Sequence, residues 1–340
     1  MGRVAVSSPE MSDRALHLFA NALVWDNHTV PAMRIGNPDA LRHLRRHKAA
    51  GVDVVCVNVG FDGQPNEVIH FLADFRRWLT INNEEFALIG TAEDIGEARN
   101  QGKLAVCFDL EGGCALFENV NMVALYYDLG VRWMLFAYNR NNHLAGGCED
   151  EDTGLTRFGR EVLAEMERIG MLVCCSHIGH RSAMEILDVA TRPVIFSHSN
   201  PMGISMHRRN IHDEAIKACA RTGGVVGING IGAFLGDNDI RTERLVDHID
   251  YVVDLVGSQH VGIGLDYAFE INMDEVDAFI NANPHLYPPG GYPNPREMRF
   301  VEPERFPLIA EELLRRKYTD AEVSNIVGGN FMRVARQVWK

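Results

Sequence analysis

The chain has 340 residues, of which 46% are hydrophobic and 23% charged, a composition typical of a globular protein with a substantial core. Its formal net charge of −13 argues against nucleic acid or an anionic membrane surface as the main partner. No apolar run approaches the roughly 20 residues that a membrane-spanning helix needs, and the N-terminal segment lacks a secretory signal pattern. The seven cysteines, an odd number without zinc-ribbon spacing, favour free thiols and a cytoplasmic location.

Short apolar runs recur along the chain, and each is nearly continuous in hydrophobic residues, as strands buried on both faces of a parallel sheet are. In chain order they are 22–28, 52–59, 104–111, 131–138, 171–177, 193–198, 224–229 and 260–266. Longer amphipathic segments between them predict helices at 38–50, 64–80, 119–129, 158–169, 181–190, 212–221 and 241–257. Strands alternating with helices in this way favour an α/β fold, a (β/α)8 TIM-type barrel, over an open doubly wound sheet.

The chain after the eighth predicted strand adds a loop and two helices. Segment 284–298 is rich in proline and glycine, which excludes a regular helix or a central strand and favours a lid or packing loop. Additional C-terminal helices are predicted near 304–316 and 319–338, and Thr319 and Glu322 at the start of the second are spaced as a capping box. Without a repeat or a linker, we expect one domain covering residues 1–340.

Three side chains that bind metals well stand where predicted strands end. Glu111 ends the run 104–111, and His177 and His198 end two later runs. Because the carboxyl ends of barrel strands converge on one face, residues far apart in sequence can share one ion there. Both histidines can instead be hydrogen-bonded core residues, and Glu111 can instead contact a helix N-terminus or pair with an arginine.

Three further residues suggest roles in catalysis or substrate binding. Asp266 ends the eighth predicted strand, where a carboxylate can act as a general base toward a water or simply cap the helix that follows. Arg208 and Arg209 follow the sixth strand, where a guanidinium can hold a substrate carboxylate, although a surface position is the default for arginine. The glycine-rich segment 223–232 is not a nucleotide-binding fingerprint, because its glycines lie within and after a strand.

Several of these segments together resemble the membrane (renal) dipeptidase family of metallopeptidases, which belong to the amidohydrolase-type barrels. The matching motifs, in the family's order, are DNH at 26–28, LEGG at 110–113, GLTRFGREVLAEMERIGMLV at 154–173, SHIG at 176–179, PVIFSHSN at 193–200, RRN at 208–210, GIGLD at 262–266 and TDAEVSNIVGGNFMRV at 319–334. The resemblance implies a (β/α)8 fold and two divalent ions, usually zinc, that act in dipeptide cleavage. Family members often form dimers, so a homodimer is compatible with it.

The resemblance also implies a metal role for four residues. Glu111 would bridge two ions, His177 and His198 would complete the shell of the second ion, and His28 would bind the first. The family's first-strand pattern is His, any residue, Asp, whereas here Val30 stands at the Asp position. A valine cannot bind a metal, so the first ion loses a charged ligand.

For the substrate, the resemblance implies that Arg209 holds a carboxylate and that Asp266 lies beside the nucleophilic water. Tyr138 stands where many family members have a substrate-contacting histidine. A tyrosine can donate a hydrogen bond but is neutral near pH 7, so it would polarise the scissile carbonyl less. Cys174 stands where an Asp commonly precedes the second-ion histidine, which would alter a supporting contact.

Three functions are compatible with these residues. The first is a zinc-dependent hydrolase of the dipeptidase type with one or two ions, and the second is a related enzyme that acts on another small amide, N-acyl or lactone compound bearing a carboxylate. The third is a non-catalytic small-molecule binder that keeps the barrel pocket but has lost the first metal site. Joint retention of the acidic and histidine residues favours a hydrolase, because a pure binder has no physical need for that set.

Overall fold

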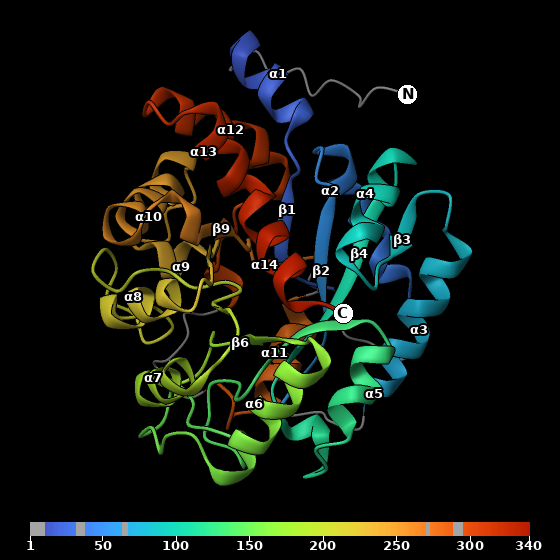
Figure 1. The fold of residues 1–340 in the computed structure, drawn as a ribbon, viewed down its shortest axis with the longest axis vertical. Helices are drawn as coiled ribbons and strands as arrows, with labels where there is room; N and C mark the ends of the chain where they lie inside the picture. The colour runs from blue at the N-terminus through green and yellow to red at the C-terminus, as the bar shows by residue number, and fades with distance from the viewer. Residues whose placement is uncertain (1–10, 32–37, 63–66, 270–272, 288–294) are drawn as a thin grey trace.

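Parallel strands form the centre of the protein (Figure 1). The computed structural model describes residues 11–31, 38–62, 67–269, 273–287 and 295–340. Its strands within these ranges are β1 (Trp25–Val30), β2 (Val54–Phe61), β3 (Phe86–Leu88), β4 (Leu104–Glu111), β5 (Val131–Leu135), β6 (Leu172–Cys174), β7 (Val194–Ile195), β8 (Val226–Ile228), β9 (Val261–Ile263) and β10 (Tyr267–Ala268).

The strands close into a barrel in the order β1-β2-β4-β5-β6-β7-β8-β9. The ladder from β1 to β7 is parallel throughout, and β8 pairs parallel with β9. A parallel bridge between Phe196 and Val226 joins β7 to β8, and the Asp266 amide donates to the His28 carbonyl at 3.1 Å, which joins the end of β9 to β1. The predicted barrel is confirmed, with its strands at the eight predicted places.

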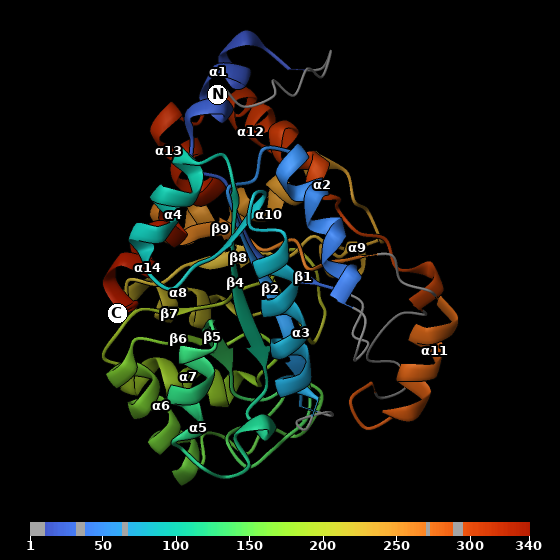
Figure 2. The ribbon, with the colours of Figure 1, turned by 90° about the vertical axis from the view of Figure 1, so that its right-hand side faces the viewer.

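Helices surround these strands (Figures 1 and 2). They are α1 (Asp13–Asn21), α2 (Leu44–Ala49), α3 (Val68–Ile81), α4 (Ala92–Asn100), α5 (Met122–Asp128), α6 (Arg157–Ile169), α7 (His180–Val189), α8 (Asp213–Arg221), α9 (Gly232–Leu235), α10 (Thr242–Val256), α11 (Met273–Ala282), α12 (Phe306–Arg315), α13 (Asp320–Ser324) and α14 (Asn330–Val338). Figure 2 shows α11 at the outer edge of the molecule, apart from the other helices. Within the described ranges, no helix combines the length and apolar character that crossing a bilayer requires.

The structure contains elements that the sequence pattern did not predict, namely α1, β3, α4, α9, β10 and α11. β3 has three residues, which is too short for a periodic signal. The predicted helix at 319–338 is also interrupted, because a π-helical turn at Asn325–Gly329 separates α13 from α14. A side chain at Gly328 would collide with the backbone of Leu23, so this glycine lets the turn pack against the segment before β1. Part of the predicted loop 284–298 lies outside the described residues.

The amino-terminal end of the barrel is filled by apolar side chains of the C-terminal segment. The Trp25 ring lies 6.0 Å from that of Phe331 and 5.7 Å from that of Trp339, measured between ring centroids. An added methyl group at Gly262 of β9 would collide with the ring of Phe331 on α14, so this glycine lets α14 pack closely against the strand. Because this end of the barrel is packed with apolar groups, polar side chains gather at the opposite end, where the strands terminate.

Candidate metal centre

Three histidine side chains converge on one carboxylate oxygen at the carboxyl ends of the strands. The Nε2 atoms of His28, His177 and His198 lie 3.6, 3.2 and 3.2 Å from Oε1 of Glu111. These residues come from β1, from the loops after β6 and β7, and from the last position of β4. All four side chains are buried, so the structure brings together the four residues predicted as metal ligands.

Two atoms of this cluster lack a hydrogen-bond partner among the described residues. Nε2 of His28 and Oε1 of Glu111 are both buried, and neither forms a hydrogen bond within that part of the chain. A buried polar atom without a partner costs about 1–3 kcal/mol. One donor atom from each of His28, Glu111 and His198 lies within 4.8 Å of the others, and imidazole with carboxylate is a donor set that suits zinc. The residues therefore fit a divalent cation.

The charges of the cluster also favour a cation. Burial raises the pKa of Glu111 to about 8 and that of Asp109 to about 6. Burial alone would lower the pKa of His28, but the nearby carboxylates of Asp109, Glu111 and Asp266 raise it to about 10. Metal ligands bind in their deprotonated forms, so an ion that enters this cluster displaces protons and replaces their charge.

The other two histidines are held in the neutral form. Burial lowers the pKa of His177 and of His198 well below the usual value, and the positive charge of Arg209 adds to the effect at both. Their Nε2 atoms lie 2.9 Å apart, and the His198 ring stacks on the His28 ring at a centroid distance of 4.0 Å. Neutral imidazole is the form that coordinates metals.

Each of the three histidines is oriented by a partner on its other ring nitrogen. The distances from Nδ1 are 3.2 Å to Asp109 Oδ2 for His28, 2.8 Å to Asn139 Oδ1 for His177 and 2.7 Å to Ser197 Oγ for His198. Such contacts fix the ring so that Nε2 faces the metal position. The sequence reading missed these partners, although the alternation of strand side chains places Asp109 and Glu111 on the same face of β4 and could have indicated the first.

Asp266 lies at the edge of the same cluster. Its Oδ1 is 3.5 Å from Nε2 of His28, and Asn229 Nδ2 donates to its Oδ2 at 2.8 Å. Burial raises the pKa of this carboxyl group. The backbone of Asp266 is left-handed at φ 57°, as is that of His177 at φ 65°, a conformation that costs a non-glycine residue about 1–3 kcal/mol. Backbone strain at two residues whose side chains belong to one cluster is typical of a functional site.

Tyr138 packs directly on a predicted ligand. Its ring stacks on His177 with centroids 4.3 Å apart, and its hydroxyl lies 3.0 Å from the hydroxyl of Tyr287. Its backbone amide donates to Asp62 Oδ2 at 2.9 Å, which ties the end of β5 to the end of β2. The structure therefore places this tyrosine at the cluster, where the sequence predicted a substrate contact.

The two adjacent arginines occupy different environments. The Arg209 residue is 2% exposed, and its guanidinium lies 5.4 Å from the centre of the Phe234 ring. Burial raises the pKa of Glu111 and of Asp266, and the positive charge of Arg209 offsets part of that rise, so this arginine acts electrostatically on the cluster. The Arg208 side chain is 67% exposed and lies 3.5 Å from Oε2 of Glu149. Of the two arginines, only Arg209 is therefore buried.

Other residues singled out from the sequence have structural contacts. Asp26 is two residues before His28, but its Oδ1 accepts the Leu265 amide at 2.9 Å and its Oδ2 lies 3.0 Å from Nε2 of His47. It is therefore not placed to substitute for the Asp that Val30 replaces. Cys174 Sγ lies 3.0 Å from Ser197 Oγ, the hydroxyl that contacts His198, so the cysteine supports that ligand through an intermediate residue.

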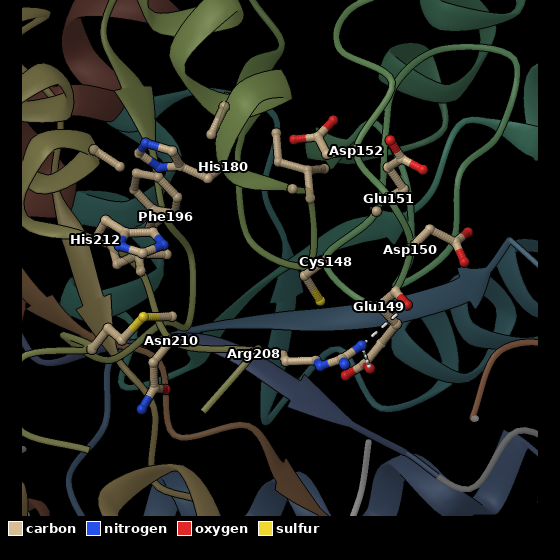
Figure 3. A pocket seen from close by; sticks show the side chains of 17 residues that line it. Cys148, Glu149, Asp150, Glu151, Asp152, His180, Phe196, Arg208, Asn210 and His212 are labelled. Carbon is tan, nitrogen blue, oxygen red and sulfur yellow. Dashed lines mark hydrogen bonds and ion pairs between the residues drawn. The ribbon is translucent and has the colours of Figure 1, made fainter. Parts of the chain in front are cut away.

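A cavity of about 460 Å³ adjoins the cluster (Figure 3). Its wall is formed by the acidic loop 149–152 on one side and by His180 and His212, whose ring centroids are 4.5 Å apart, on the other. The Cys148 amide donates to the His177 carbonyl at 3.0 Å, so the cavity borders the segment that carries this ligand. Of the candidate site residues named from the sequence, Arg208 lines the cavity, but none of the four predicted metal ligands does, so we assign the chemistry to the buried cluster instead.

A parallel barrel with imidazole and carboxylate groups at the carboxyl ends of its strands defines the class of amidohydrolase-type barrels. Within this class the chain belongs to the membrane dipeptidase family, peptidase family M19, whose sequence model matches residues 67–279. An uncharacterized dipeptidase of Schizosaccharomyces pombe is 30% identical over 274 residues, which cover 78% of this chain and 60% of that protein. The chain thus spans less than two thirds of that relative's length.

Two solved structures show the same fold. An amidohydrolase from Pseudomonas aeruginosa is 26% identical, with a TM-score of 0.85 over 96% of this chain and 99% of that chain. A metallopeptidase from Rhodobacter sphaeroides, liganded with a phosphinate mimic of the dipeptide L-Ala-D-Ala, is 17% identical, with a TM-score of 0.77 over 94% of this chain and 99% of that chain. At that lower identity the second likeness shows the fold alone.

Proposed function

We propose that this protein is a metal-dependent hydrolase that cleaves a dipeptide, or a similar small amide, bearing a carboxylate. The observation that carries the proposal is the convergence of three buried histidine Nε2 atoms on Oε1 of Glu111. Membership of the M19 family supports it, because a metal-ligand set at the carboxyl face of a barrel is where such enzymes perform chemistry.

Zinc held by His28, Glu111, His177 and His198 would supply Lewis acidity, which makes a water more acidic and polarises a carbonyl group. Asp266, beside the cluster, takes a proton from the attacking water and returns it to the leaving nitrogen. The C–O bond to the water oxygen forms first, and the amide C–N bond then breaks as the leaving nitrogen takes up the proton, so the products are an acid and an amine. Burial of these residues excludes bulk water and strengthens their electrostatic interactions.

Arg209 and Tyr138 would orient the substrate in this mechanism. A buried guanidinium can hold a carboxylate through two parallel hydrogen bonds, which fixes the amide relative to the cluster. The Tyr138 hydroxyl, next to that of Tyr287, is a neutral donor that can face a substrate oxygen. A neutral donor stabilises developing negative charge less than an imidazolium does, so we expect modest rates on ordinary dipeptides.

The number of ions is part of the proposal. Val30 ends β1 and pairs in register with Ala268, and it offers no ligand atom. The site of the first ion, at His28, would then keep two carboxylates as possible ligands. Glu111 Oε1 lies 3.6 Å and Asp266 Oδ1 lies 3.5 Å from Nε2 of His28. We propose one firmly bound zinc ion and a second, weaker one. Elemental analysis of protein purified without chelator, and again after zinc loading, counts them directly.

Turnover is tested with zinc-loaded and chelator-treated protein against a library of dipeptides that includes L-Ala-D-Ala, by measuring the release of free amino acid. We expect hydrolysis that depends on zinc and falls by at least about 100-fold after chelation. Equal turnover with and without metal would contradict the mechanism. A homodimer and a single domain covering the chain are also proposed; sedimentation and limited proteolysis test them.

A second candidate function is a small-molecule binder without catalysis, and Val30 is the observation that favours it. A binder would retain no ion after loading, and it would bind a dipeptide, as measured by calorimetry, without releasing an amino acid. Retention of a metal ion together with turnover would exclude this alternative.

A further inference from the structure

The segment that carries Asp266 is attached to β1 residue by residue. Besides the parallel pairing of β10 with β1, four hydrogen bonds join them: Leu265 N to Asp26 Oδ1 at 2.9 Å, Asp266 N to His28 O at 3.1 Å, Thr29 Oγ1 to Tyr267 O at 2.7 Å and Phe269 N to Val30 O at 3.0 Å. Two of them join backbone groups only, and one uses a hydroxyl group. The Asp26 bond differs because its acceptor is a carboxylate, which can be removed without changing the backbone.

The Asp26 carboxylate is itself held in place. It is fully buried, and its second oxygen lies 3.0 Å from Nε2 of His47, which is also fully buried. The His47 ring, from α2, packs edge-on against Phe269 with centroids 5.6 Å apart. A buried carboxylate is stable only when it is paired, and here both of its oxygens are engaged. Asp26 and His47 therefore contact the Asp266 segment on both sides of that residue.

Such an attachment matters because the Asp266 backbone is strained. A non-glycine residue at φ 57° is stable only where its surroundings hold it there. The amide that donates to Asp26 is that of Leu265, the residue directly before Asp266, while the Asp266 amide donates to the His28 carbonyl. Without the Asp26 acceptor, the peptide unit between Gly264 and Leu265 can rotate. The backbone that leads into Asp266 can then relax toward an ordinary conformation, which would move the Asp266 carboxylate away from His28.

We propose that Asp26 is a positioning residue for Asp266, with His47 holding Asp26 in place. The proposal rests on the proposed function, since the role of Asp266 as a base belongs to it. The two carboxylate oxygens of Asp26 are engaged by the Leu265 amide and by His47, so Asp26 is not one of the candidate ligands. It acts through one backbone amide, and the consequence of losing it is a misplaced base.

Kinetics provide the first test. Asp26→Ala should lower kcat by about 10–100-fold with KM changed less than about 3-fold, because a displacement of about 1 Å in a reacting group costs on that order. Asp26→Asn should restore most of kcat, since its amide oxygen can still accept the Leu265 hydrogen bond. The Asp26→Asn variant also keeps the test decisive if the alanine variant does not fold. Metal content should stay at the wild-type value in both.

Asp53 provides a matched control at the other end of the barrel. Its Oδ2 accepts the Val24 amide at 2.8 Å, so Asp53→Ala removes the same kind of bond, far from the cluster along the strand. We expect this variant to melt at a lower temperature with kcat unchanged. If Asp26→Ala behaved in the same way, with lower stability and an unchanged kcat, the positioning role would be wrong.

Amide hydrogen exchange gives a readout that does not depend on turnover. Peptides covering 261–269 should exchange faster in Asp26→Ala than in the wild type or in Asp26→Asn, while the same peptides in Asp53→Ala should not. Unchanged exchange in Asp26→Ala would overturn the proposal even if kcat fell. If the wild type hydrolysed no substrate, the proposed function would fail, and the exchange data would still decide whether Asp26 holds this segment.

Discussion

Oδ2 of Asp109 lies 3.2 Å from Nδ1 of His28, and both side chains are completely buried. A carboxylate on one ring nitrogen fixes the direction of the other, so the position of Asp109 determines where Nε2 of His28 points. The carboxylate belongs to β4 and the imidazole to β1, two strands separated in the sheet by β2. A ligand of the candidate centre is thus oriented from across the barrel interior.

Asp109→Asn should weaken zinc binding by about 10–100-fold, because an amide orients the His28 ring less firmly and makes it a weaker base. Competition with a fluorescent chelator measures the affinity. Asp53→Asn, a buried carboxylate at the other end of the barrel, should leave the affinity unchanged. Equal zinc affinity in Asp109→Asn and the wild type would show that this contact does not support the centre.

Arg209→Ala should lower kcat/KM for carboxylate-bearing substrates by about 10–100-fold, since a hydrogen-bonded charge pair is worth about 1.5–3 kcal/mol. Amidated substrates, which lack the carboxylate, should be affected far less. Arg208→Ala is the matched control, because the Arg208 side chain is 67% exposed and faces Glu149. The same loss for amidated and free-acid substrates would count against the clamp.

Val30→Asp should increase the zinc retained per chain, because it places a carboxylate two residues after His28, as in the family pattern. Elemental analysis after dialysis gives the count. Val30→Asn, of similar size but without charge, should retain less zinc than the aspartate variant. If the wild type already retains two ions per chain, the assignment of a weakened first site is wrong.

His248→Gln should reduce the dependence of stability on pH between about 4 and 6.5. The His248 imidazole, on α10, is buried, and its Nε2 lies 3.0 Å from the Leu235 carbonyl oxygen. Burial lowers the pKa of His248 from 6.5 to about 4. In this window the unfolded chain binds a proton that the folded chain does not, so the free energy of unfolding falls as pH falls. At about 1.4 kcal/mol per pH unit, the difference is roughly 3 kcal/mol.

Urea denaturation of both proteins at pH 7 and pH 4 measures this difference. The glutamine variant should lose less stability than the wild type on acidification. An equal loss in the two proteins would show that His248 carries no such effect.

Phe331→Ala should lower the free energy of unfolding by about 3–5 kcal/mol, because the ring is buried at the amino-terminal end of the barrel, against Trp25. Met206→Ala, at a residue 86% exposed, should change it by less than about 0.5 kcal/mol. Both are measured by urea denaturation, and zinc affinity should be the same in both. A loss below about 1 kcal/mol in Phe331→Ala would contradict the packing described for this end.

The strands of the barrel could be predicted because each is buried on both faces, and its sequence is therefore a nearly continuous run of apolar residues. For the same reason Glu111 and Asp266 stand out as charged residues that end such runs. β3 was not predicted because three residues are too few to show a hydrophobic periodicity. The break between α13 and α14 was not predicted because it depends on Gly328 packing against a segment about 300 residues away in sequence. Contacts across that separation leave no local pattern.

The polar partners of the site were harder to predict than the ligands themselves. Asn139 and Ser197 orient His177 and His198, yet asparagine and serine in a loop usually belong to turns, so neither signals a metal centre on its own. Position alone could not distinguish Arg209 from Arg208, because their difference in burial is set by how one loop turns; only the family resemblance selected Arg209. The role of Asp26 depends on the Leu265 amide, which no side-chain pattern encodes.

The left-handed backbone at His177 and Asp266 has a consequence for engineering. Glycine adopts this conformation without strain, so substitutions there could make the fold more tolerant of heat while removing the side chains that the chemistry needs. A selection for thermal resistance alone would therefore be drawn toward positions 177 and 266 and would yield robust but inactive variants. A library meant to improve this scaffold should hold both positions constant.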